Sequence, residues 1–141
     1  QVHAFGGCKR HPHGRVVTVA YYALIDISNH QLKVNQNELS WVPVRLLKKM
    51  AFDHRSILNT CLDQLREQVF ERPVLFNLLP PQFTLRSLQE LYESVLDETL
   101  DRRNFRKKIA VKHWLRDTGE MEKGVVHRPG RLYMVKPEAA K

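Results

Sequence analysis

The chain has 141 residues, of which 43% are hydrophobic, and its 23 lysines and arginines outnumber its 15 aspartates and glutamates to give a net charge of +8. This length is enough for one ordinary domain or two small ones, each with its own core. The apolar runs are shorter than the roughly 20 residues that a membrane-spanning helix needs, and no secretory signal opens the sequence. We therefore expect a cytoplasmic protein that makes no use of a membrane.

The positive charge is concentrated in one part of the chain. Residues 1–101 hold 11 basic and 11 acidic residues, whereas residues 102–136 hold 11 basic and three acidic residues. This distribution excludes a uniformly basic protein and predicts a basic module joined to a neutral one. Because the composition changes near Arg72, we predict a first domain over residues 1–71 and a second over residues 72–141.

The first half is predicted to mix strands and a helix. Residues 16–26 are rich in β-branched and aromatic side chains, which is typical of a buried strand, and a second short strand is expected over residues 38–44. From Asp53 to Phe70 the apolar residues recur at steps of one, three and four, which predicts an amphipathic helix. Trp41 is expected to be a packing residue.

The second half has the element order of a winged helix-turn-helix. Thr84 is predicted to cap an amphipathic helix that runs to residue 96, and Asp101 to open a basic helix that runs to residue 112. Two short strands, over residues 113–117 and 131–135, are expected to follow as a hairpin. A helix, a short turn, a basic helix and a hairpin are together typical of this DNA-binding fold.

The basic helix is predicted to have an apolar and a charged face. At about 100° per residue, Phe105 and Ile109 lie about 40° apart and should both face the core. The opposite face and its flanks carry five positive side chains and one asparagine. Arg103, Asn104 and Lys107 lie on the face, and Arg102, Arg106 and Lys108 lie on its flanks. Arginine pairs with guanine, asparagine pairs with adenine, and lysine neutralises phosphate, so this face favours DNA contact. A solvated helix face without a partner is the alternative interpretation.

Further contacts with the DNA backbone are expected from the first turn of the preceding helix and from the hairpin. The amides at a helix N-terminus favour phosphate, and the hairpin carries several basic residues. The residues assigned to DNA binding are Thr84, Arg86, Arg102, Arg103, Asn104, Arg106, Lys107, Lys123, Arg128 and Arg131.

Longer motifs resemble a known family. The stretch FNLLPPQFTLRSLQELYESVLDETLDRRNFRKKI, with weaker matches in HGRVVTVAYYALI and AFDHRSIL, resembles the Nudix-related transcriptional regulators of the NrtR group. The resemblance implies an α+β fold, in which a partial Nudix-like α/β sheet domain precedes a winged helix-turn-helix domain. It also implies a homodimeric repressor that binds double-stranded operator DNA with the helix at residues 101–112. The implied effector is ADP-ribose or a pentose sugar.

The resemblance also indicates what this chain does not contain. A Nudix box ends in R-E-hydrophobic-x-E-E and binds magnesium, but no two glutamates are adjacent in these 141 residues. We therefore expect no catalytic residue and no cofactor here, and a missing N-terminal Nudix segment as a partner of residues 1–71. Arg15 and His54 are candidates for effector binding, although a strand-edge charge and a brace for the following helix are the simpler interpretations.

Two alternative functions stay open. In the first, an intact Nudix box lies upstream, and the complete protein is a hydrolase of ADP-ribose or a related nucleotide. In the second, the basic helix binds an acidic protein and not DNA. A metal site is a weaker alternative. The zinc-ligand types His3, Cys8, His11 and His13 are irregularly spaced in a glycine-rich loop, so we assign no metal.

Overall fold

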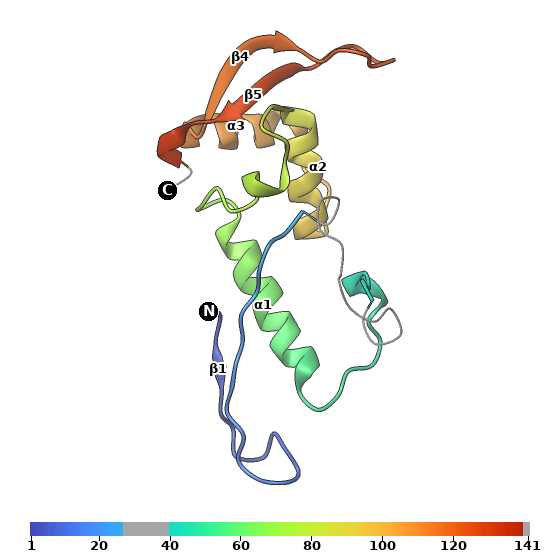
Figure 1. The fold of residues 1–141 in the computed structure, drawn as a ribbon, viewed down its shortest axis with the longest axis vertical. Helices are drawn as coiled ribbons and strands as arrows, with labels where there is room; N and C mark the ends of the chain where they lie inside the picture. Colours follow the sequence, from blue (N-terminus) through green and yellow to red (C-terminus); the bar gives the residue numbers. More distant parts are fainter. Residues whose placement is uncertain (27–39, 140–141) are drawn as a thin grey trace. The chain divides into compact units, whose positions relative to one another are not determined.

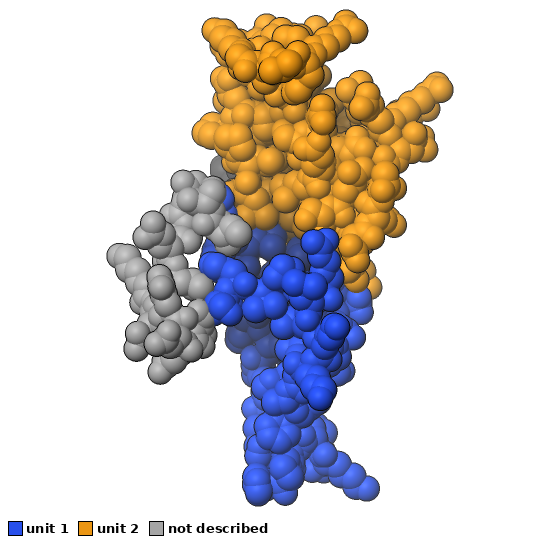
Figure 2. All heavy atoms as spheres, turned by 90° about the vertical axis from the view of Figure 1, so that its right-hand side faces the viewer, with its two compact units in different colours: residues 1–65 blue, residues 66–141 orange. Residues whose placement is uncertain are grey.

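The computed structural model describes residues 1–26 and 40–139. It divides into two compact units, residues 1–65 and residues 66–141, which Figure 2 shows in separate colours. No helix in the described part of the chain is both long enough and apolar enough to cross a membrane.

The first unit contains two short strands and most of one helix. Strands β1 (Ala4–Phe5) and β2 (Thr18–Val19) pair antiparallel, and a 3₁₀ helix, η1 (Val44–Leu46), follows later in the chain. Helix α1 (His54–Gln68) then begins (Figure 1), and its last residues belong to the second unit. This helix confirms the one predicted from the apolar spacing, and Leu65 is its buried residue.

The first predicted strand is wrong in its extent and in its burial. Of residues 16–26 only Thr18 and Val19 form a strand, and several of the apolar side chains are exposed, with Val17 at 59% and Tyr21 at 66%. A segment rich in β-branched residues becomes a buried strand only where neighbouring strands pair with it and a further layer covers it. Among the described residues, β1 is the only strand that pairs with β2.

The second predicted strand also differs from the structure. Its residues 38–39 lie outside the described residues, residues 40–43 form no strand, and Val44 begins the 3₁₀ helix η1. Trp41, which was expected to be a packing residue, is 53% exposed. Pro43 lacks the amide hydrogen that a strand would use, which favours a turn into η1 at this point.

The second unit is a winged helix. A short 3₁₀ helix leads into β3, two helices follow, and β4 and β5 form the hairpin that Figure 1 shows above α3. The three strands form an antiparallel sheet in the order β3-β5-β4. The elements are η2 (Phe76–Leu78), β3 (Phe83–Thr84), α2 (Leu85–Leu96), α3 (Arg102–Lys112), β4 (Leu115–Met121), β5 (Arg131–Val135) and η3 (Pro137–Ala139).

Both predicted helices and the second hairpin strand are confirmed, whereas β4 begins and ends later than predicted. Helix α3 ends at Lys112, and its C-cap, His113, adopts a left-handed conformation with φ of 54°. Strand β4 therefore begins only at Leu115, and it continues to Met121 because it pairs with β5 as far as Arg131.

The core of the second unit fixes which face of α3 meets solvent. Phe105 and Ile109 are only 2% and 3% exposed, as the helix wheel predicted. The ring of Tyr92 in α2 meets Phe105 edge-on, with 5.3 Å between ring centroids. Because α3 is anchored through this apolar face, its charged face points away from the core. Further buried residues of this unit are Val69, Leu75, Phe76, Phe83 and Leu88.

Candidate nucleic-acid interface

The start of α3 is held by a cap. The Asp101 carboxylate accepts a hydrogen bond of 2.8 Å from the Asn104 amide, which satisfies one of the unpaired amides at the start of the helix. With Phe105 and Ile109 in the core, the remaining side chains of the first two turns are exposed. The exposed polar residues on this face include the five that the sequence assigned to DNA binding: Arg102, Arg103, Asn104, Arg106 and Lys107.

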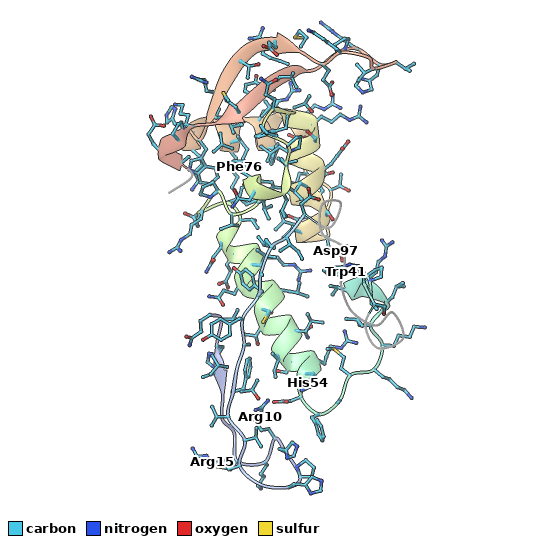
Figure 3. The ribbon with its side chains drawn as sticks, in the orientation of Figure 1. Arg10, Arg15, Trp41, His54, Phe76 and Asp97 are labelled. Carbon is cyan, nitrogen blue, oxygen red and sulfur yellow. The ribbon has the colours of Figure 1, made fainter. Side chains whose placement is uncertain are left out.

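The turn between the two helices is fixed by one carboxylate. Helix α2 ends at Leu96, and its C-cap, Asp97, adopts a left-handed conformation with φ of 59° (Figure 3). The Glu93 carboxylate accepts hydrogen bonds from Gln89 Nε2 at 2.9 Å and from the Leu100 amide at 2.8 Å. These two bonds lower the pKa of Glu93. They connect the last turn of α2 to the residue just before the α3 cap.

The start of α2 is also capped, and this uses the side chain of Thr84. Thr84 Oγ1 accepts from the Ser87 amide at 3.0 Å, and Ser87 Oγ accepts from the Thr84 amide at 3.2 Å, which completes a capping box. Thr84 is 7% exposed. Its hydroxyl is therefore occupied within the protein, whereas Arg86 is exposed and pairs with Glu90 at 2.9 Å.

A basic groove of about 580 Å³ lies between the two helices and the hairpin. Both helices and β5 contribute to its lining. Five arginines and one acidic residue, Glu122, line it. Glu122 accepts a hydrogen bond of 2.9 Å from the Gly130 amide, so its charge also ties the two sides of the hairpin together. The arginines of this basic groove are Arg86, Arg102, Arg106, Arg128 and Arg131.

The hairpin carries the remaining predicted contacts. Lys123, Arg128 and Arg131 are all exposed. Arg131 Nη1 lies 2.6 Å from Asp117 Oδ2, and this carboxylate raises the pKa of the Arg131 guanidinium. The hairpin tip also presents Val126, which is fully exposed. The tip therefore combines positive charge with an apolar side chain.

Lys108 is exposed, and its amine contacts an aromatic ring. The wheel placed it on a flank of the charged face, and its Nζ lies 3.4 Å from the centroid of the Phe70 ring. An ammonium over an aromatic face is attracted by the negative charge density of the ring. Lys108 thus contacts the segment that follows α1. No sequence signal identifies this pair, because the two residues are 38 positions apart.

The candidate effector residues of the first unit, Arg15 and His54, lie apart in Figure 3. Arg15 is exposed and makes no hydrogen bond or ion pair within the described residues, and the His54 ring lies 6.3 Å from the Phe52 ring. Figure 3 labels Arg15 and His54 together with a residue that the sequence analysis missed, Arg10. Arg10 binds the Asp53 carboxylate through two nitrogens, at 2.7 and 3.0 Å.

Arg10 organises the loop of residues 6–17. Besides Asp53, its guanidinium donates to Thr18 Oγ1 at 2.7 Å and to the Phe5 carbonyl at 3.1 Å. Its charge holds the pKa of Asp53 below the ordinary value. This arginine joins both strands to the residue before α1. Its role depends on a contact between residues 43 positions apart, for which neither neighbouring residues nor spacing gives a signal.

A metal site in the histidine-rich loop is not formed by the described residues. His11 and His13 lie near each other, with 5.6 Å between ring centroids. No group of three or more His, Cys, Asp or Glu side chains in residues 1–26 and 40–139 is placed to hold a metal ion.

The comparison with protein families concerns the second unit. Residues 75–135 match the family described as the NrtR DNA-binding winged helix domain. This range covers α2, α3, the three-stranded sheet and the basic groove. Residues 75–135 form an NrtR winged helix domain. The resemblance to the NrtR group that the sequence motifs indicated is confirmed over this range.

Relatives of known identity resemble the chain beyond the NrtR winged helix domain. The chain is 34% identical over 136 residues to the ADPR responsive transcriptional repressor NtrR of Acinetobacter baylyi, a match that covers 94% of the chain and 54% of the relative. The chain therefore spans about half the length of this curated relative.

Solved NrtR structures show the same fold. The crystal structure of Shewanella oneidensis NrtR complexed with a 27mer DNA has a TM-score of 0.79 at 28% identity, over 99% of this chain and 65% of that one. A second structure of Shewanella oneidensis NrtR has a TM-score of 0.73 at 28% identity, over 100% of this chain and 65% of that one. The likeness to NrtR thus extends over both units.

Proposed function

We propose that this chain is part of a transcriptional repressor that binds double-stranded operator DNA through its NrtR winged helix domain. The observation that carries the proposal is the exposed polar face of α3 beside the basic groove. A negatively charged, regular polymer fits this arrangement, because a row of arginines can neutralise successive phosphates while α3 meets base edges. The Acinetobacter baylyi relative is described as a repressor, which supports regulation over the alternative of Nudix hydrolysis.

The two parts of this surface have different roles in the proposal. Arg103, Asn104 and Lys107 on α3 enter the major groove, where arginine and asparagine read bases. The basic groove and Lys123 hold the sugar-phosphate backbone. Thr84 receives a different role from the one that its position in the sequence suggested. Because its hydroxyl is used in the capping box, it sets the start of α2 and leaves phosphate contact to Arg86.

The first unit is proposed to belong to a Nudix-like sensor domain. The A. baylyi relative is described as responsive to ADP-ribose, and we propose the same effector here, with a pentose sugar as the alternative. Arg15 and His54 remain candidates for effector contacts, because both are exposed. The proposed regulator acts as a cytoplasmic homodimer, and its sensor domain includes a Nudix segment beyond these residues.

Selection from random-sequence DNA tests the main proposal. We expect the selection to enrich a two-fold symmetric motif. If roughly six phosphates are neutralised, the logarithm of the affinity should fall with the logarithm of the salt concentration at a slope of about −5. Repeating the selection with ADP-ribose and with pentoses tests the effector. The absence of an enriched motif, or binding that does not respond to salt, would contradict DNA recognition and favour an acidic protein as the partner.

Substitutions separate base reading from backbone contact. Asn104→Ala should weaken the preference for the selected operator over random DNA by about 1–3 kcal/mol, whereas Lys123→Ala should weaken binding to both DNAs and lower the salt slope by about one. Asn59→Ala is the matched control, because Asn59 is an exposed asparagine on a helix in the first unit. Equal effects of Asn104→Ala on both DNAs would argue against base reading.

A further inference from the structure

Strand β4 is irregular beside the basic groove. Asp117 pairs with Tyr133 and Met121 with Arg131, so β4 advances four residues while β5 advances two. The extra residues form a bulge in which Gly119 has a φ of 78°, a conformation that residues with side chains rarely adopt. The bulge lies on the strand that faces Arg131.

One carboxylate connects the bulge to Arg131. Asp117 Oδ1 accepts from the Gly119 amide at 2.8 Å, and Asp117 Oδ2 accepts from Arg131 Nη1 at 2.6 Å. The Gly119 amide and then Arg131 lower the pKa of Asp117, so the group is a charged acceptor at neutral pH. A carboxylate that is bonded on one side to the backbone gives the arginine a fixed anchor.

The ion pair with Asp117 leaves most hydrogen-bond donors of Arg131 unoccupied. It lines the basic groove together with Arg102 and Arg106 from α3. Its side chain is 61% exposed, and Asp117 occupies one of the five N–H donors of the guanidinium. The other donors are available to a phosphate. The bond to Asp117 thus restricts the positions in which the guanidinium can donate these hydrogen bonds.

We propose that Asp117 is a positioning residue for operator recognition, which fixes Arg131 in the basic groove so that it meets the backbone phosphate only of a correctly docked duplex. This inference rests on the proposed function. The Asp117 charge repels any DNA that approaches, so it weakens non-specific binding. In the specific complex, the repulsion is offset because the arginine is already oriented and loses less side-chain freedom on binding.

The test compares two variants that remove one negative charge from the same strand. Asp117→Asn keeps an oxygen that can accept from the Gly119 amide but loses the ion pair with Arg131. Glu120→Gln is the matched control, because Glu120 is an exposed residue of β4. Affinity for the selected operator and for random DNA is measured for each variant, with thermal unfolding as a check on the fold.

The expected results differ between the variants. Asp117→Asn should raise the affinity for random DNA and lower the ratio of operator to random affinity by about two- to fivefold, the range expected when an exposed ion pair is lost. Glu120→Gln should raise both affinities equally and leave the ratio unchanged. A ratio that Asp117→Asn leaves unchanged would overturn the proposal. So would an equal loss on both DNAs with a lower melting temperature, which indicates a purely structural role.

A measurement without DNA separates this inference from the proposed function. The Nη1–H signals of Arg131 in ¹⁵N NMR spectra should be sharp and protected from exchange in the parent chain and in Glu120→Gln, and averaged in Asp117→Asn. A parent chain that prefers no operator would overturn the proposed function while these signals still report the anchor. An Arg131 signal that Asp117→Asn does not alter would overturn the positioning role, whatever the DNA preference.

Discussion

The two units of this chain differ in how their apolar side chains are placed. In residues 1–65 the buried hydrophobic residues are Ala20 and Leu65 among those described, and many large apolar side chains are exposed. In the described part of the second unit, residues 66–139, eight hydrophobic residues are buried, and the exposed large ones are Val111, Met121 and Val126. Among the described residues, the second unit therefore encloses a core of its own, whereas the first unit buries only two hydrophobic residues.

This difference shows which sequence signals are sufficient by themselves to predict an element of the structure. The helices of the second unit are defined by nearby residues, since Thr84 and Asp101 cap helices whose first turns follow directly. Their apolar faces meet over a short stretch of chain, since Tyr92 of α2 contacts Phe105 of α3. The strand signal of residues 16–26 instead depends on pairing with strands and on covering layers that lie elsewhere.

The largest effect is expected when the two units are expressed separately and their folding is compared. Residues 66–141 should unfold cooperatively and bind DNA, because their core is internal to the unit. Residues 1–65 should show no cooperative transition, because they bury too few apolar side chains to offset the entropy of ordering the chain. Thermal melts followed by circular dichroism and the dispersion of amide signals in NMR spectra measure both. A cooperative melt of residues 1–65 alone would contradict the contrast.

The same contrast explains what the sequence predicted. In the second unit the order of two helices and a hairpin, both caps, the buried pair Phe105 and Ile109 and the exposed face of α3 follow from local spacing, and the structure confirms them. The basic groove forms only where the hairpin lies beside the two helices. The sequence therefore predicted its arginines as separate DNA contacts, but it did not predict that they line one groove. The contact of Lys108 with Phe70 and the anchor of Arg10 on Asp53 depend on distant residues, and no local pattern indicates them.

A core substitution in α3 tests whether the second unit is stabilised by its own buried residues. Phe105→Ala should lower the free energy of unfolding by about 3–5 kcal/mol, because it removes a buried ring that contacts Tyr92 and leaves a cavity. Val111→Ala on the same helix is the control, since Val111 is 74% exposed and its truncation should change the free energy by less than about 0.5 kcal/mol. Chemical denaturation measures both. Similar effects of the two variants would show that α3 is not packed as described.

A buried hydrogen bond gives a smaller test of the same core. The Tyr92 hydroxyl donates to the Val69 carbonyl at 2.8 Å, and burial raises the pKa of this phenol. Tyr92→Phe should lower the free energy of unfolding by about 1–2 kcal/mol, because the ring stays in place while the carbonyl loses its partner. Tyr21→Phe is the control, since Tyr21 is 66% exposed in the first unit. An unchanged stability of Tyr92→Phe would mean that water replaces the hydroxyl.

The smallest expected effect concerns pH and the turn between α2 and α3. The pKa of Glu93 is lowered in the folded state, mainly by the hydrogen bond from Gln89 and then by that from the Leu100 amide. A carboxyl whose folded pKa lies below its unfolded pKa stabilises the fold above the unfolded pKa, and this stability is lost as the pH falls through the folded pKa. The parent chain should therefore exceed Glu93→Gln in stability at neutral pH, and the difference should shrink as the pH falls below about 5.

The control for this prediction removes a nearby charge without the two hydrogen bonds. Glu98 is exposed just after α2, so Glu98→Gln should unfold at nearly the same denaturant concentration as the parent chain throughout this pH range. Denaturant titrations between about pH 3 and pH 7 compare the three proteins. A difference between the parent chain and Glu93→Gln that stays constant across this range would contradict the charged hydrogen bonds. It would leave packing of the Glu93 side chain as the source of any stability, since packing does not respond to the ionisation of a carboxyl group.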